Sequence, residues 1–174
     1  MNQGDSRFIH SRSSCGQVQD LLQIIFTAEI LAPSRCLWLI SPWISDIRVI
    51  DNRANRFIHL DPEWRGREVC LSEVIGKLLN LGTTVRVVTR PLEHNNSFVE
   101  KMEFFQSSGL PISVKVLDEL HEKGLLGDYY YLSGSMNFTF MGITVNDESI
   151  HYHTARDIVA ENRLVFASRW GAEI

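Results

Sequence analysis

The stretch HEKGLLGDYYYLSGSMN, residues 121–137, constrains the fold and chemistry of this chain more than any other. Side chains two residues apart on an extended segment share one face, so we expect His121 and Lys123 side by side. A neutral imidazole can attack phosphorus, and an ammonium can hold a phosphate oxygen. Asn137 adds an amide donor for another oxygen. These three side chains have the chemical groups to act together on a phosphate.

The order of residue types, H-x-K-x4-D followed by G-S-x-N, resembles the HKD motif of the phospholipase D superfamily. The resemblance is strong over residues 115–150 and weaker over residues 37–43. It implies a phospholipase-D-like α/β fold and cleavage of phosphodiester bonds without a metal or another cofactor. The interval between Asp128 and Gly134 is one residue shorter than the commonest form, which is a small change within a turn.

The resemblance implies a role for each residue of the motif. His121, Lys123 and Asn137 are expected to be catalytic. Glu148 is expected to accept a hydrogen bond from the second ring nitrogen of His121, which fixes the tautomer and frees the attacking nitrogen. Supporting or structural roles are expected for Asp128, Gly134 and Ser135. A lone H-x-K pair usually marks a surface histidine, but the joint match in order favours the functional interpretation.

Hydrophobic periodicity and chain-breaking residues predict a single α/β domain over residues 1–174. Strands that alternate with helices favour a mixed β-sheet flanked by helices on both faces. A capping box, Ser97 to Glu100, is expected to open the third helix. Residues 46–68 read as a long irregular loop. The expected helices are 17–32, 71–81, 97–108 and 154–170, and the expected strands are 36–40, 83–89, 112–117, 129–132 and 149–153.

Composition places the chain among soluble globular proteins, with 174 residues, 44% hydrophobic and 22% charged. No apolar run has the length of a membrane span, and residues 1–15 lack the apolar stretch of a signal peptide. Cys15, Cys36 and Cys70 are odd in number and widely spaced, which favours neither a disulfide framework nor a zinc site. We therefore expect a cytoplasmic protein that does not bind membranes.

The net charge of −4 bears on nucleic-acid binding, because non-specific DNA-binding domains are usually basic. A nucleic-acid enzyme with this charge needs a local patch, a dimer groove or a partner protein. Residues 46–68 contain five arginines, but their acidic residues bring the net charge of the segment to zero. The segment is either a nucleic-acid patch or a solvated loop of mixed charge.

A single HKD motif implies a dimer, because the mechanism of the family uses two histidines on opposite sides of the phosphorus. None of the other candidates, His94, His151 and His153, has a lysine two residues later. A two-fold axis places the same residue of each chain face to face. We therefore expect a homodimer with one composite site.

Other residues are weaker candidates. His94 follows a predicted strand and either contacts substrate or is an exposed loop histidine. Trp43 follows another strand. It either lines the site or stacks on a base, or it packs at the edge of the core. His151 and His153 share a face, but no third ligand at suitable spacing accompanies them, so we expect no metal site.

The substrate is expected to be DNA, because short, soluble, one-motif members of this superfamily are mostly nucleases. Residues 9–14 and 33–46 are similar to the DpdK proteins of bacterial clusters that insert 7-deazapurines into DNA and restrict unmodified DNA. That similarity implies a defence system with other protein partners. Two alternatives stay open: a phosphodiesterase acting on lipids or small nucleotides, and a phosphate-binding subunit without catalytic activity.

Overall fold

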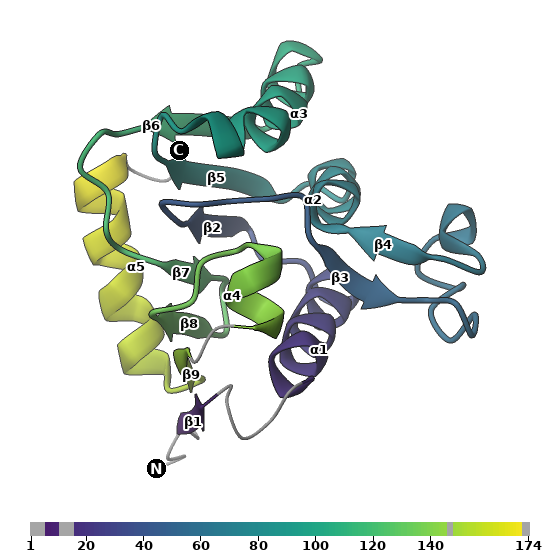
Figure 1. Cartoon of the computed structure of the whole chain (residues 1–174). Helices are drawn as coiled ribbons and strands as arrows, with labels where there is room; N and C mark the ends of the chain where they lie inside the picture. Colours follow the sequence, from purple (N-terminus) through teal and green to yellow (C-terminus); the bar gives the residue numbers. More distant parts are fainter. Residues whose placement is uncertain (1–5, 11–15, 146–147, 172–174) are drawn as a thin grey trace.

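A seven-stranded mixed β-sheet runs through the centre of the molecule (Figure 1). The computed structural model describes residues 6–10, 16–145 and 148–171. The strands of this sheet are β1 Ser6–His10, β2 Cys36–Ile40, β5 Thr84–Thr89, β6 Ile112–Val116, β7 Gly124–Leu126, β8 Tyr131–Gly134 and β9 Ser149–His153. Their spatial order is β1-β9-β8-β7-β2-β5-β6. The pairs β2–β5 and β5–β6 are parallel, and the other pairs are antiparallel.

Helices cover both faces of the sheet, as the sequence predicted. They are α1 Gln17–Leu31, α2 Leu71–Asn80, α3 Asn96–Ser107, α4 Phe140–Thr144 and α5 Arg156–Trp170. The side chains of α5 pack in one hydrophobic cluster, and those of the other four helices pack in a second cluster. Figure 1 shows α5 on one side of the sheet, with α1 and α2 on the other.

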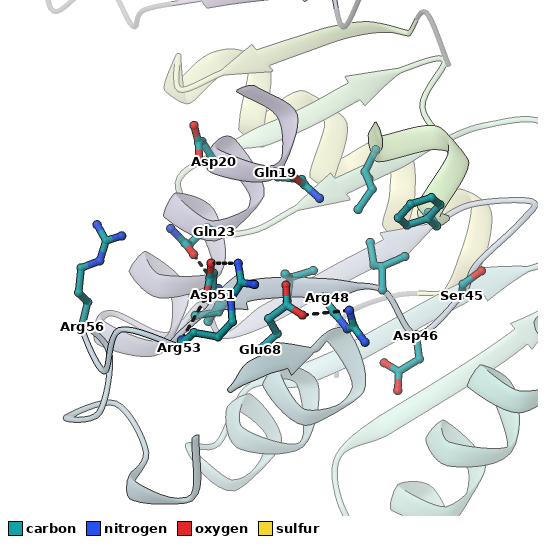
Figure 2. Close-up of a pocket in the computed structure, with 15 residues that line it drawn as sticks. Gln19, Asp20, Gln23, Ser45, Asp46, Arg48, Asp51, Arg53, Arg56 and Glu68 are labelled. Carbon is teal, nitrogen blue, oxygen red and sulfur yellow. Dashed lines mark hydrogen bonds and ion pairs between the residues drawn. The ribbon is translucent and has the colours of Figure 1, made fainter. Parts of the chain in front are cut away.

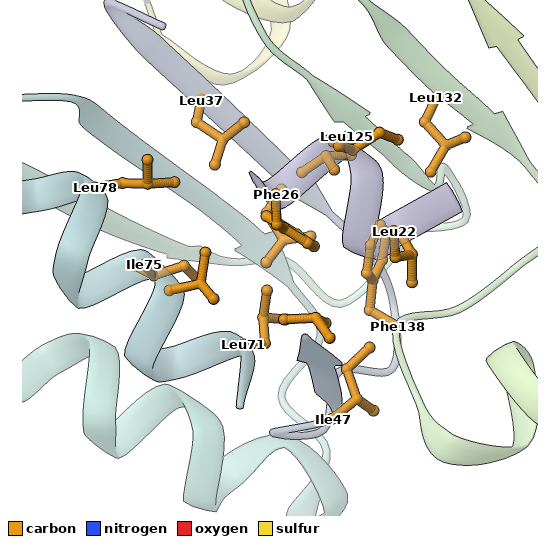
Figure 3. Close-up of a cluster of buried hydrophobic side chains, with 14 of the residues drawn as sticks. Leu22, Phe26, Leu37, Ile47, Leu71, Ile75, Leu78, Leu125, Leu132 and Phe138 are labelled. Carbon is orange, nitrogen blue, oxygen red and sulfur yellow. The ribbon is translucent and has the colours of Figure 1, made fainter. Parts of the chain in front are cut away.

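Strand β2 separates these two clusters, because successive side chains of a strand point to opposite faces. Leu37 and Leu39 join α1 and α2 in the larger cluster, where Figure 3 shows Leu37 near Phe26. On the other face, the ring centroids of Trp38 and Phe166 of α5 lie 6.0 Å apart. All five residues of β2 are buried. A continuous apolar strand of this kind is typical of the middle of a covered sheet.

The expectation of an irregular loop at residues 46–68 was wrong in part. The segment contains β3 Arg48–Asp51 and a short 3-10 helix, η2 Pro62–Trp64, and it ends where β4 Glu68–Cys70 begins. Strands β3 and β4 pair as a separate two-stranded ribbon. The turn between them is organised by buried Asn52, which donates to the Trp64 carbonyl at 2.9 Å and accepts from the Phe57 amide at 2.7 Å. Such tertiary hydrogen bonds leave no periodic signal in the sequence.

The predicted order of elements otherwise agrees with the structure. Strands 36–40 and 149–153 occur at the predicted bounds, and strand 129–132 is shifted to Tyr131–Gly134. The capping box at Ser97 was wrong, because α3 begins at Asn96 after a short 3-10 helix and has no side-chain cap. Sequence reasoning missed β1 and α4, and also β7, whose three residues are too few to show a clear period. Within the described residues, no helix is both long and apolar enough to reach across a bilayer.

Candidate active site

The registers of the central strands bring the motif residues to one end of the sheet. Ile40, the last residue of β2, pairs with Gly124, and Gly124 pairs with Ser133 near the end of β8. Gly134 pairs with Ile150 near the start of β9. The residues just outside these pairs, Ser41, Lys123, Ser135 and Glu148, therefore lie at the same end, which we call the site end. Four chain segments converge there.

His121 and Lys123 lie in the loop that leads into β7. His121 is exposed, and Lys123 is half-buried. The Lys123 ammonium donates to the carbonyl of His121 at 2.8 Å, which holds the end of the lysine over the loop. Burial lowers the pKa of Lys123, and the charge of Glu148 opposes this shift. Lys123 is thus a partly desolvated cation beside an acid, and it can take up a phosphate oxygen.

Glu148 and Ser135 form a pair between the end of β8 and the start of β9. The Ser135 hydroxyl donates to the carboxylate of Glu148, which is 7% exposed. The same hydroxyl accepts from the Ser149 amide at 3.0 Å, and the Ser135 amide donates to the Ser149 carbonyl at 3.0 Å. The pairing of Glu148 with the His121 ring stays a prediction. Asn146, two residues before Glu148, lies outside the described residues.

Gly134 permits the close approach of these two strands. Its φ of 142° belongs to a region that residues with a side chain rarely adopt. A Cβ atom built at this position would lie 1.9 Å from the carbonyl oxygen of Ser149. Only glycine fits here, and this requirement gives a steric reason for the Gly-Ser order of the motif.

Asn137 is tied to the loop after β2 by the hydroxyl of Ser41. Ser41 Oγ lies 3.3 Å from Asn137 Oδ1 and 2.8 Å from the Trp43 carbonyl. Because the contact with Ser41 uses the amide oxygen, the Nδ2 hydrogens of Asn137 are the part that can donate to a phosphate. Sequence reasoning missed Ser41, since its partner is 96 residues away.

Asp128 lies at the opposite end of β7 from Lys123. Its carboxylate accepts from the backbone and side chain of Arg35 at 3.2 and 3.1 Å, and from Arg163 of α5 at 2.6 Å. Burial raises the pKa of Asp128, but hydrogen bonds from Arg35 and Arg163 more than offset that effect, so the pKa lies below its ordinary value. These contacts join β2, β7 and α5, and they support a structural role away from the reacting groups.

His94 and Trp43 both lie near the site end, on loops that follow β5 and β2. Exposed His94 forms a 2.7 Å hydrogen bond between its Nε2 and the hydroxyl of Ser45. Trp43 is 41% exposed, so a large part of its side chain lies in solvent and not in the core. The Ser45 amide also donates to the Phe138 carbonyl at 2.8 Å, so the loop between Trp43 and Ser45 contacts both His94 and the segment that carries Asn137.

His151 and His153 lie on β9 with their rings parallel and 6.1 Å apart. His153 also stacks on Tyr131 at 6.4 Å. Over residues 6–10, 16–145 and 148–171, no three His, Cys, Asp or Glu side chains gather as a metal site requires. The two histidines form part of an aromatic row on the sheet.

A groove of about 490 Å³ lies beside the site end, between α1, the β3–β4 ribbon and α4 (Figure 2). Ser45, the partner of His94, lies on its rim. Two of its arginines are paired with acids: Arg53 with Asp51 at 2.7 Å and Arg48 with Glu68 at 2.9 Å. Of the two interpretations of residues 46–68, these ion pairs therefore favour a solvated segment of mixed charge over a basic patch.

Comparisons with solved structures identify the fold. NucT from Helicobacter pylori matches with a TM-score of 0.62 at 12% identity, over 95% of each chain. Nuc from Salmonella typhimurium, a phospholipase D family member, matches with a TM-score of 0.61 at 14% identity, over 97% of this chain and 95% of that chain. The chain has the phospholipase D fold.

A phosphatidylserine synthase from Haemophilus influenzae has a similar fold, with a TM-score of 0.61 at 15% identity, over 94% of this chain and 38% of that one. No family model matches the sequence, and no curated protein matches it. The phospholipase D fold is thus shown by structure alone, at identities where activity does not follow from fold. The motif residues carry the functional argument.

Proposed function

We propose that this chain is a metal-independent phosphodiesterase with the phospholipase D fold, in which residues 1–174 act as one domain. The observation that carries the proposal is the convergence of Lys123, Asn137 and the Ser135–Glu148 pair at one end of the sheet. A cation, an amide donor and a buried acid lie at the end of the sheet where the segment that bears His121 leads into β7. They suit a phosphate whose negative charge grows in the transition state.

The proposed reaction has two steps. His121 attacks the phosphorus, a nitrogen–phosphorus bond forms, and the bond to the leaving oxygen breaks as a second histidine donates its proton to that oxygen. The second histidine, now neutral, then takes a proton from water, and the water oxygen attacks phosphorus and releases His121. Lys123 and Asn137 bind the other phosphate oxygens in both steps. The products are a phosphomonoester and an alcohol.

The second histidine is proposed to be His121 of another copy of this chain, in a two-fold homodimer. Three apolar side chains of α4 and its C-terminal cap, a few residues after Asn137, support this arrangement. Phe140, Met141 and Val145 are 64, 51 and 60% exposed. An apolar surface next to an incomplete site suits a contact that completes the site. The dimer then buries these side chains while it brings the two His121 rings together.

The substrate is proposed to be DNA, within a bacterial modification and restriction system. This finer assignment rests on the similarity of two segments, residues 9–14 and 33–46, to the DpdK proteins. Residues 11–14 of the first segment lie outside the described residues. Two of the three arginines that line the groove, Arg48 and Arg53, are paired with acids, which reduces the positive charge that the groove offers to DNA. This supports a protein that reaches DNA with the help of other proteins.

The deciding experiment is a nuclease assay in EDTA on modified and unmodified DNA. We expect the wild-type protein to cleave DNA, and His121→Ala and Lys123→Ala each to lose at least about a hundredfold in rate. His59→Ala and Lys115→Ala serve as matched controls, because both residues are exposed and stand outside the motif. Cleavage that needs a metal and survives the loss of His121 would refute the proposal.

A lipid substrate is the second candidate, and the similarity to a phosphatidylserine synthase favours it. The same protein is therefore incubated with a phospholipid analogue in detergent. Hydrolysis of the lipid without any cleavage of DNA would assign the site to lipids. A complex whose activity survives His121→Ala would assign the chain to a phosphate-binding role instead.

A further inference from the structure

Trp43 differs from the other tryptophans of the chain in its exposure. Trp38, Trp64 and Trp170 are 0, 3 and 7% exposed and belong to the core, whereas Trp43 is 41% exposed. Trp43 also lies at the site end, because it follows β2 within three residues of Ile40. A large aromatic ring that remains in water beside a phosphate site suggests a ligand with a flat apolar face.

The loop that carries Trp43 is held firmly by a buried asparagine. Asn95, 1% exposed, accepts from the Ile44 amide at 2.9 Å and donates to the Pro42 carbonyl at 2.8 Å. The Trp43 carbonyl itself accepts from Ser41 at 2.8 Å. The backbone on both sides of Trp43 is therefore fixed before any ligand arrives, which lowers the entropic cost of binding on the ring.

Arg90, the residue directly after β5, lies beside Trp43. Its guanidinium carbon lies 5.9 Å from the centroid of the Trp43 ring. The Nε of Arg90 is buried and has no hydrogen-bond partner among the described residues. Arg90 follows β5 and Lys123 precedes β7, two strand spacings away, so their backbones lie about 10 Å apart across the sheet. The site end thus has a second positive group, with an aromatic ring beside it.

The charge of Arg90 distinguishes between two ligands that could bind the Trp43 ring, a quaternary ammonium head group and a nucleotide. A quaternary ammonium head group binds aromatic rings through cation–π attraction, but Arg90 already occupies this ring and repels a second cation. A nucleotide instead brings an aromatic base for the ring and an anionic phosphate for the guanidinium. The pair therefore favours a nucleic acid over a choline-type lipid.

We propose that Trp43 and Arg90 form a stacking site for a nucleobase adjacent to the phosphate held by Lys123 and Asn137. The hydroxyl of Ser41 links the two sites, since it lies 2.8 Å from the Trp43 carbonyl and 3.3 Å from Asn137 Oδ1. A base that stacks on Trp43 has left its own stack, so the site selects single-stranded or locally opened DNA. This inference rests on the proposed phosphodiesterase function and names the part of the substrate that the site recognises.

The test combines a change in the protein with a change in the DNA. The probe is a fluorescein-labelled single-stranded oligonucleotide, and a second probe carries abasic positions around its centre. Binding to the full-length His121→Ala protein, which is expected not to cleave, is measured by anisotropy with and without Trp43→Ala. Stacking on one base predicts a loss of roughly five- to a hundredfold in affinity for the normal strand. The abasic strand is expected to bind both proteins equally.

Conservative and control variants separate stacking from a loss of structure. Trp43→Phe is expected to recover most of the affinity, because phenylalanine keeps an aromatic face. Tyr129→Ala removes a side chain that is 70% exposed, at the opposite end of the sheet next to Asp128, and is expected to change nothing. The solution mass of each variant is measured so that a loss of dimer is recognised.

The outcomes distinguish this inference from the proposed function. An equal loss of affinity for normal and abasic strands, or no loss at all, overturns the stacking site even if the wild-type protein cleaves DNA. Base-dependent binding that Trp43→Ala removes supports the stacking site even if cleavage is absent. Loss of cleavage in Lys123→Ala tests the function separately, because Lys123 contacts phosphate rather than the base.

Discussion

Burial lowers the pKa of Lys123, and the carboxylate of Glu148 opposes that shift without cancelling it. The lysine therefore releases its proton at a lower pH than a lysine in water. The two residues are 25 positions apart in the chain, and they interact because β7, β8 and β9 are neighbours with aligned ends. This coupling has a consequence that pH titration can measure.

Glu148→Gln should move the alkaline limb of the activity profile to lower pH. Removal of the negative charge removes the effect that raises the pKa of Lys123, so the pKa falls further. Activity needs the protonated lysine and is lost as the pH rises through this pKa. The measurement is kcat/KM for DNA against pH. Glu161→Gln, a substitution at an exposed position of α5, is the control. If the alkaline limb lay at the same pH in the wild type and both variants, the coupling between Glu148 and Lys123 would be contradicted.

Heterodimers should report whether both copies of His121 serve one site. Wild-type and His121→Ala chains with different tags are co-expressed, and the mixed dimer is purified. A composite site predicts a rate at least about a hundredfold below that of the wild-type dimer, because one of the two histidines is missing. A mixed dimer with about half of the wild-type rate would mean that each chain carries an independent site.

Asp128→Asn should destabilise the protein while it spares the chemistry. The substitution leaves Arg163, whose side chain is 15% exposed, without its acid. The loss of one partner of a partly buried pair costs about 3 kcal/mol. In a chain of this size, that lowers Tm by roughly 6–12 °C. Thermal unfolding measures this change, with Asp118→Asn at an exposed position as the control. At temperatures below the unfolding range, the activity per folded molecule should stay near that of the wild type.

Gly134→Ala should disturb the site more than a comparable glycine change elsewhere. The new Cβ meets the Ser149 carbonyl, and only a shift of β8 or β9 relieves the contact, which moves Ser135 and Glu148. Gly66 also has a positive φ, of 70°, but nothing lies within 4 Å of a Cβ there. Gly66→Ala should cost about 1–2 kcal/mol from the backbone alone, without loss of activity.

Chemical denaturation and DNA cleavage are measured for both glycine variants. A Gly134→Ala protein as stable and as active as Gly66→Ala would show that the turn has room to adapt. Loss of activity with a native-like fold would instead identify Gly134 as the residue that sets the position of the Ser135–Glu148 pair.

Local pattern was sufficient for the order of elements and for the motif. Strand Cys36–Ile40 is a run of apolar residues closed by Ser41 and Pro42, and strand Ser149–His153 alternates, so both were predicted at their observed bounds. Local pattern failed for β7, whose Gly-Leu-Leu has too few residues to alternate. It also failed for the β3–β4 ribbon, which is stabilised by the buried side chain of Asn52.

The sequence by itself determined which chemical groups are present: His121, Lys123 and Asn137, in the order and spacing that suit a phosphate. The tertiary structure decided where each one lies. Lys123 and Asp128 are five residues apart, yet β7 crosses the sheet between them and places them at opposite ends. Ser41 and Asn137 are 96 residues apart and share a hydrogen bond. The physical reason is that spacing along a chain sets periodicity, whereas strand register sets which distant residues meet.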